Sequence, residues 1–185
     1  MTNFKEEELE YLDVLDEKGN KIGKEKRSKI HQKGLWHKAV HIWILNSQNE
    51  LLIQKRSANV RHPNQWDISS AGHIPAGRGS FETALEEIKE ELGINVSKKD
   101  LKLLFVVKQN YQDKKENYIN NEINDVYLLK TNMPLSSFKV SKEEISELKY
   151  ISIDKLRDFI EKEDPSFVPH PEEYKELFNY LDKNF

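Results

Sequence analysis

Three glutamates stand close together in one acidic stretch of the chain. Glu87, Glu90 and Glu91 lie at positions i, i+3 and i+4, so on a helix their carboxylates occupy adjacent turns. Glu90 and Glu91 fall in the last turn, where the helix dipole disfavours anions by about 0.3–1 kcal/mol each. A divalent cation would remove both penalties, because clustered carboxylate oxygens are the usual protein ligands of Mg²⁺. The alternative is a solvated acidic helix face, which is what most charge runs are.

A glycine-broken loop leads into this helix, and together they form the stretch GHIPAGRGSFETALEEIKEELGI, residues 72–94. Four of the seven glycines of the chain lie here, which indicates a tight loop or a close approach to a ligand. We expect Ser80 to cap the helix and Gly93 to end it. One helix face is apolar and should pack on a sheet; it carries Phe81, Leu85, Ile88 and Leu92.

This stretch resembles the Nudix box, G-x5-E-x7-R-E-U-x-E-E-x-G-U, where U is aliphatic. The box marks hydrolases of nucleoside diphosphates linked to another moiety. The fixed positions of the pattern are met by Gly72, Glu87, Ile88, Glu90, Glu91, Gly93 and Ile94. The resemblance implies a metal site at Glu87, Glu90 and Glu91, with Glu87 and Glu90 carrying catalysis. It also implies Mg²⁺ as the cofactor, with Mn²⁺ able to substitute.

Two positions of the chain depart from the box. Arg78 stands where the pattern has its first Glu, and Glu86 stands where it has Arg. In the family these two side chains help to brace the loop against the helix, so the chain could carry the same pair with its charges exchanged. The alternative is a box that has lost efficient catalysis and serves a nucleotide-binding or sensor module.

A second resemblance narrows the branch of the superfamily. The order RS, HPNQW and SSAGH, within residues 56–73, resembles the metal-dependent isopentenyl-diphosphate isomerases and the hydrolases most similar to them. This likeness covers roughly residues 8–180. The isomerases carry a catalytic cysteine shortly before the Gly-His of the loop, where this chain has Ser69, Ser70 and Ala71. A serine hydroxyl is far too weak an acid to replace that thiol, so isomerisation is disfavoured.

The isomerase branch also directs attention to three histidines. Isomerases hold a metal with two histidines ahead of the central strand and one in the Gly-His loop. His31, His37 and His73 stand at similar places, although the first spacing is one residue short. Three imidazoles would suit Zn²⁺ or Mn²⁺ better than Mg²⁺. The alternative is a set of loop histidines engaged in ordinary hydrogen bonds.

Substrate contacts are expected from the loop that joins these motifs. Arg56 and Arg61 could meet a phosphate, or could equally be surface cations, and Gly72 and His73 lie where the resemblance places substrate. Trp66 in the same loop is interpreted as a core anchor rather than a ligand platform.

Further carboxylates could assist the site. Glu122 begins a strand and could contact metal or water, but one acid at a strand end is more often solvated surface. Glu143 and Glu144 fall in a segment where the family can supply an extra metal ligand or base, and the sequence singles out neither.

Composition excludes several classes of function. The net charge of −3 gives no basic footprint for a nucleic-acid polymer. No apolar run is long enough for a membrane span, and the N-terminus lacks a signal peptide's apolar core. Cysteine is absent, which excludes disulfides and thiolate chemistry. A cytoplasmic protein with a small-molecule organic diphosphate as partner is the simplest interpretation, and family resemblance adds a possible homodimer.

The remaining pattern predicts one α/β domain over residues 1–185, with residues 1–9 frayed. We expect strands at 11–15, near Ile22, and at 38–46, 51–56, 101–109 and 123–130. Residues 110–121 are interpreted as a mobile hairpin tip, and helices are expected at 153–161 and 172–184, the first with Leu156, Phe159 and Ile160 inward. With the resemblance, the order predicts a Nudix-type α/β/α sandwich around a mixed, curved sheet. The predicted function is metal-dependent cleavage of a diphosphate linkage in a nucleoside diphosphate derivative or related organic diphosphate.

Overall fold

The computed structural model describes residues 10–185, so the expected frayed segment 1–9 lies outside the described residues. Strand β3 (Trp36–Leu45) lies at the centre of the sheet and is buried along most of its length. It pairs in parallel with β8 (Tyr118–Lys130) over ten residues, from Trp36 opposite Asn121 to Leu45 opposite Lys130. Along its other edge β3 pairs antiparallel with β1 (Tyr11–Leu15), β6 (Ser70–His73) and β4 (Glu50–Arg56) in turn. The sheet is therefore mixed, as predicted.

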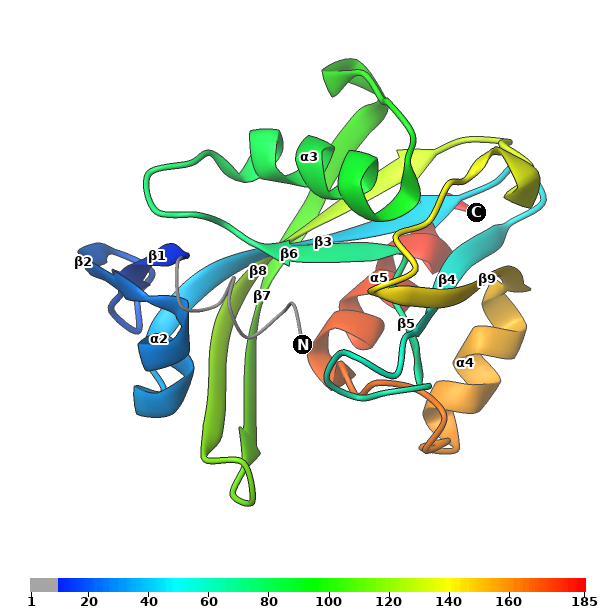
Figure 1. Cartoon of the computed structure of the whole chain (residues 1–185). Coiled ribbons are helices and arrows are strands. Elements are labelled where there is room, and N and C mark those ends of the chain that lie inside the picture. Colours follow the sequence, from blue (N-terminus) through cyan, green and yellow to red (C-terminus); the bar gives the residue numbers. More distant parts are fainter. Residues whose placement is uncertain (1–9) are drawn as a thin grey trace.

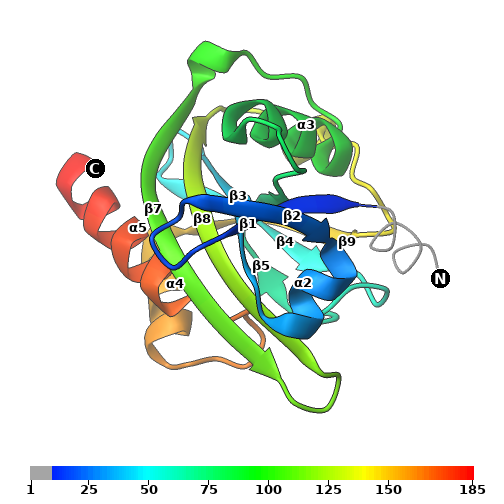
Figure 2. The ribbon, with the colours of Figure 1, turned by 90° about the vertical axis from the view of Figure 1, so that its left-hand side faces the viewer.

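Four more strands extend this centre. β2 (Lys21–Lys26) forms the expected hairpin with β1, while β5 (Trp66–Asp67) and β9 (Ile145–Ser152) both pair with β4. β7 (Leu101–Asp113) pairs with β8 in a long curved hairpin that projects beyond the rest of the sheet (Figure 2). The prediction of a tip over residues 110–121 was wrong in extent, because the strands pair as far as Asp113 and Tyr118.

Helices cover both faces of the sheet (Figure 1). α3 (Ser80–Leu92) lies on one face, where Ile88 and Leu92 pack against Ile42 of β3. α4 (Ile153–Glu161) and α5 (Pro171–Asn184) lie on the other, where Leu177 packs with Trp43. The α/β/α sandwich is confirmed, and it arises because alternate residues of β3 are apolar toward both layers.

Several local predictions differ from the structure. Ser80 is not the helix cap: Gly79 is, and the Ser80 hydroxyl instead pairs with the hydroxyl of Tyr127 at 2.7 Å. Gly93 does end α3, in the left-handed conformation. Phe159 was expected inward but is 37% exposed. The residue of α4 that is fully buried is Leu156. Trp66 is half-buried, with the Lys149 ammonium 3.6 Å from its ring centre.

Three short helical elements were not predicted. α2 (Arg27–Lys33) precedes β3 and ends at Gly34, whose φ of 63° is the left-handed value that glycine accepts readily. Two 3₁₀ turns, η1 (Lys98–Asp100) and η2 (Leu135–Ser137), flank the β7–β8 hairpin in sequence. α2 matters most, because it carries His31 over the end of the sheet.

Buried charges beneath α5 are paired. Glu173 contacts His41 Nδ1 at 2.5 Å and accepts the indole N–H of Trp43 at 2.8 Å. Burial alone would lower the pKa of His41, but the Glu173 carboxylate outweighs it and raises that pKa to about 9. α5 is thus held on the sheet by an ionised, buried pair as well as by its apolar stripe. Within residues 10–185 no helix is long and apolar enough to cross a bilayer.

Candidate functional site

The three box glutamates occupy different environments beside β6. Gly72 passes so close to α3 that a Cβ built there would overlap the Glu87 side chain, so a larger residue would force that carboxylate to move. The backbone N–H of Ala71 donates to Glu91 Oε2 at 3.1 Å. Glu87 and Glu91 are therefore packed against the backbone of β6, whereas Glu90 is exposed. Gly72 itself lies in a strand rather than in the expected loop, and the close approach is to a carboxylate of the chain.

Burial and mutual repulsion shape the charge of this group. Burial raises the pKa of Glu87 to about 8, and the carboxylates of Glu90 and Glu144 add to the rise. Burial also raises the pKa of Glu91 well above its ordinary value, with Glu87 and Glu144 contributing. Glu144 therefore faces both box glutamates, while neighbouring Glu143 is exposed. The structure distinguishes two residues that the sequence left equivalent.

These carboxylates fit a hard divalent cation. Burial and the neighbouring carboxylates both raise the pKa of Glu87 and Glu91, because each disfavours the negatively charged form. Oxygen ligands of this kind are those that Mg²⁺ and Mn²⁺ accept. A cation between them would remove both the repulsion and much of the cost of burial.

The two departures from the box meet in space. Arg78 Nη2 forms an ion pair with Glu86 Oε1, joining the glycine loop to the outer face of α3. Both side chains are about half exposed, so the pair adds little to global stability. Its geometric effect is to link the loop to the helix with the charges in the opposite order from the box pattern.

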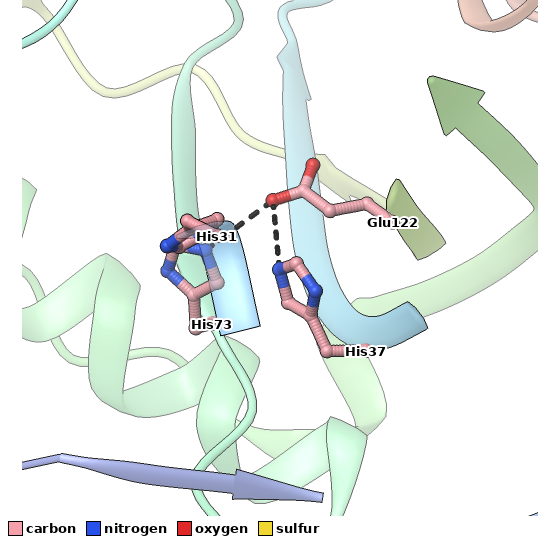
Figure 3. A group of neighbouring side chains, drawn as sticks. All are labelled: His31, His37, His73 and Glu122. Carbon is pink, nitrogen blue, oxygen red and sulfur yellow. Dashed lines mark ion pairs between the residues drawn. The ribbon is translucent and has the colours of Figure 1, made fainter. Parts of the chain in front are cut away.

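A second group gathers on the opposite face of the sheet. His31 of α2, His37 of β3, His73 of β6 and Glu122 of β8 converge from four elements (Figure 3). One potential ligand atom from each lies within 4.8 Å of all the others. Strand register explains the convergence, since His37 pairs with Glu122 and Ala39 pairs with His73 across adjacent strands. We call these four residues the imidazole cluster.

One hydrogen bond fixes a proton position in the imidazole cluster. His37 Nδ1 lies 3.0 Å from the Leu35 carbonyl oxygen, which can only accept, so Nδ1 carries a proton. His37 Nε2 then faces Glu122 Oε1 at 3.6 Å. His73 Nε2 lies 3.3 Å from the same oxygen. A proton or a metal cation between these nitrogens and the carboxylate makes such contacts favourable.

His31 is the least satisfied member of the imidazole cluster. Its side chain is buried, and neither ring nitrogen has a hydrogen-bond partner in the described part of the chain. Burial lowers the pKa of His31 to about 2 and that of His73 to about 3, with neighbouring positive groups contributing. Burial would raise the pKa of Glu122, but His37 and His73 hold it well below its ordinary value. Imidazole nitrogens beside a carboxylate form a donor set suited to a transition metal.

Two sequence interpretations are corrected here. Glu122 is not solvated surface: it is 7% exposed and lies between His37 and His73. The three histidines are not a set of ordinary hydrogen-bonded loop residues, because they converge from a helix and two strands, and His31 has no hydrogen bond to its ring among residues 10–185. The sequence carried one usable signal, since Glu122 begins an apolar strand whose alternation points it to the same face as Asn124 and Val126.

The expected phosphate-binding arginines are engaged by the protein. Arg56 pairs with Asp67 at 2.8 Å and also donates to the Arg61 carbonyl oxygen. Arg61 pairs with Glu116 at 2.5 Å and lies over the ring of Tyr118. A cation that sequence reasoning missed is Arg27, paired with Glu10 at 2.9 Å, whose charge acts on both His31 and Glu87. The sequence clue to Arg27 was its position four residues before His31, which puts both side chains on the same helix face.

Comparison with known proteins identifies the fold and its relatives. The sequence model of the NUDIX domain matches residues 35–171. The chain is 42% identical over 179 residues to Nudix hydrolase 3 of Arabidopsis thaliana; this covers 93% of the chain but 23% of that relative's length. It is 28% identical over 149 residues to an isopentenyl-diphosphate Delta-isomerase of Streptomyces avermitilis, covering 80% of the chain and 73% of the relative. The isomerase-like branch inferred from the motifs is thereby confirmed.

A solved structure shares the architecture. DR0079 from Deinococcus radiodurans superposes with a TM-score of 0.64 at 22% identity, covering 83% of this chain and 90% of that one. At this level of identity the likeness concerns the fold, and it agrees with the sandwich described above.

The raised pKa of Glu87 predicts a pH-dependent stability in metal-free buffer. The pKa is about 8 in the folded chain against an ordinary value of 4.5, so folding favours the protonated form. The resulting stabilisation is complete below about pH 4.5 and is lost as the pH rises through 8. Glu87→Gln should therefore melt close to wild type at pH 5, and several degrees above it at pH 8.5.

Thermal melts in EDTA at these two pH values test this. Glu161→Gln, which neutralises an exposed glutamate of α4, is the control and should show no such pH-dependent gain. A Glu87→Gln variant that is less stable than wild type at pH 8.5 would contradict the account.

Proposed function

The chain belongs to the Nudix family, and on that premise we propose that it is a metal-dependent hydrolase of organic diphosphates. Its substrate would be a nucleoside diphosphate derivative or a related organic diphosphate. The observation that carries the proposal is the packing of Glu87 and Glu91 against the backbone of β6 at Gly72 and Ala71, with the Glu144 carboxylate close enough to raise the pKa of both.

Glu87 and Glu91 would hold the cation, Mg²⁺ with Mn²⁺ able to substitute. When bound, the cation would neutralise the charge on the diphosphate oxygens and lower the pKa of a coordinated water. Glu90, the exposed member, is free of the packing that fixes the other two, so it can turn toward that water and accept its proton. Glu144 offers a second carboxylate for the same task from the segment before β9.

Arg27 supports the diphosphate assignment. Its positive charge lowers the pKa of Glu87 and also the pKa values of His31 and His73, so it acts on both candidate metal sites. A guanidinium can bind a phosphate through two parallel hydrogen bonds. We propose that Arg27 orients the diphosphate, a role that we first expected from Arg56 and Arg61.

We also propose that the imidazole cluster is a second metal site. Three imidazoles and the Glu122 carboxylate suit Zn²⁺ or Mn²⁺ better than Mg²⁺. The Leu35 carbonyl fixes the proton of His37 on Nδ1, as outer-shell acceptors do for metal-binding histidines. Such a site would place a second positive charge across β6 from the first.

Isomerisation of isopentenyl diphosphate is the alternative activity. Relatives carry that name, but the chain has no thiol, and the Ser69 hydroxyl is committed to the backbone. It accepts from the Ile44 N–H at 2.9 Å and donates to the Leu52 carbonyl at 2.5 Å. The alternative of a non-catalytic sensor rested on Arg78 and Glu86, which depart from the box pattern. Because these two side chains form an ion pair, they still link the loop to the helix, with their charges exchanged. Hydrolysis is therefore the function that the site supports best.

The test is phosphate release from a panel of diphosphates, with coupling phosphatase where needed. The panel contains nucleoside di- and triphosphates, nucleotide sugars, dinucleotides and isoprenoid diphosphates, each with Mg²⁺, Mn²⁺ or EDTA. We expect metal-dependent turnover of at least one class. Glu87→Gln should reduce that turnover by at least about 100-fold, the scale of losing one charged stabiliser of a transition state.

Controls separate the alternatives. Glu161→Gln should retain wild-type turnover, because Glu161 lies on α4, away from β6. Interconversion of isopentenyl and dimethylallyl diphosphates in the same reactions would favour the isomerase. Tight Mg²⁺-dependent binding with no turnover across the panel would favour the sensor and contradict the hydrolase.

The exchanged pair predicts a rescue. Arg78→Glu and Glu86→Arg should each lower turnover about tenfold, because like charges would push the loop from the helix and displace the site. The double variant, which restores the box pattern, should recover turnover to within about threefold of wild type. An equivalent exchange at Arg157 and Asp182, which pair at 2.6 Å between α4 and α5, should have no effect in any combination. Additive losses in the double variant would contradict the brace.

The cytoplasmic location and the homodimer stay predictions.

A further inference from the structure

A stack of three side chains covers the imidazole cluster. The ring of Tyr118 lies on His31, with ring centres 4.5 Å apart and planes within 25°. The Arg61 guanidinium lies 3.4 Å from the centre of the same tyrosine ring. Because two groups this close cannot share one face, Tyr118 is held between Arg61 and His31.

The stack joins two segments that are distant in sequence. Arg61 belongs to the loop after β4, and Tyr118 is the first residue of β8 at the tip of the long hairpin. Arg61 also pairs with Glu116 of the hairpin turn at 2.5 Å, and His62 meets Tyr111 edge-on at 5.2 Å. The loop and the hairpin tip thus close over His31, whose side chain is buried as a result.

His31 differs from His37 in what orients its ring. His37 is fixed by the Leu35 carbonyl at 3.0 Å. His31 has no hydrogen bond to either ring nitrogen in the part of the chain that the structure describes, so hydrogen bonding does not set its rotation. A histidine ligand ordinarily receives that constraint from an acceptor behind it. The stacked ring of Tyr118 is the contact available to supply it here.

We propose that Tyr118 is a positioning residue that orients His31 for metal binding, and that Arg61 holds Tyr118 in place. This inference rests on the proposed metal site at the imidazole cluster. It also gives Arg61 a different role from the expected phosphate contact, because Arg61 would then act through Tyr118 and not on the substrate's phosphates. Planar stacking resists rotation of the imidazole about its Cβ–Cγ bond, which keeps its nitrogens directed toward His37, His73 and Glu122.

Cobalt(II) is the probe, because its visible absorption reports ligand geometry and its loss to EDTA reports retention. Absorption that is present in Glu87→Gln but absent from His31→Ala is assigned to the imidazole cluster. Tyr118→Leu keeps an apolar side chain but removes the stacked ring, whereas Tyr118→Phe keeps the ring. Tyr111→Leu is the matched control, since Tyr111 lies on the same hairpin and contacts His62.

We expect Tyr118→Leu to bind Co²⁺ about 10- to 100-fold more weakly than wild type, to release it faster to EDTA and to show an altered spectrum. Tyr118→Phe and Tyr111→Leu should stay within about threefold of wild type. Melting curves without metal identify any variant that fails to fold. Comparing Tyr118→Phe with Tyr118→Leu then shows whether metal binding needs the aromatic ring or only an apolar side chain at this position. Unchanged affinity, release and spectrum in a folded Tyr118→Leu would overturn the proposal.

Arg61 provides an independent arm. Arg61→Leu should speed Co²⁺ release severalfold while leaving the KM for the diphosphate substrate within about twofold of wild type. A raised KM with unchanged Co²⁺ release would return Arg61 to phosphate binding and overturn its role in the stack. If wild type itself shows no His31-dependent Co²⁺ signal, the imidazole metal site fails, while hydrolysis at the Glu87 group is judged separately by the substrate panel.

Discussion

The approach of strand β6 to helix α3 is the constraint on which the site depends. Because Gly72 has no Cβ, the Glu87 carboxylate can lie directly against the backbone of the strand. Because side chains alternate along a strand, His73 is then directed to the opposite face, into the imidazole cluster. One four-residue strand thereby separates two groups of potential metal ligands by the thickness of the sheet backbone. A side chain at position 72 would displace the Glu87 carboxylate from its place beside the strand.

The buried charged and polar side chains have two kinds of surroundings. Beneath α5, Glu173 is matched by His41, and Asp67 is matched by Arg56 and His170. Those contacts satisfy the groups and secure a helix, which is the usual outcome for buried charges. Around β6 the pattern is different, since Glu87 and Glu91 repel each other and His31 lacks hydrogen bonds among the described residues. Groups that reduce stability when left alone are expected where a ligand completes them.

Local patterns predicted much of this structure. Periodicity placed α3, α4 and α5, and alternation on both faces identified β3 as the central strand. The box residues were recognised because they lie within one helix and its preceding loop, where spacing in sequence fixes spacing on the helix face. The brace between Arg78 and Glu86 followed from the same local relation.

What sequence reasoning missed depends on register between distant strands. Glu122 and His37 meet because β8 pairs with β3 in parallel, 85 residues apart along the chain, and no pattern within either strand shows that pairing. Glu144 is distinguished from Glu143 only by which of them turns toward α3. Tyr118 fell within the expected hairpin tip 110–121 and could not be singled out, because its partners, Arg61 and His31, come from a loop and from an unpredicted helix.

The most direct test of the account is a crystal of the protein grown with Mn²⁺, measured for anomalous scattering. Two metal sites on opposite faces of β6 predict two peaks, one among His31, His37, His73 and Glu122, the other beside Glu87 and Glu91. His31→Ala should remove only the first peak, and Glu87→Gln only the second. No peak at either group in a crystal soaked to saturation, or peaks only at surface carboxylates, would contradict the central claim.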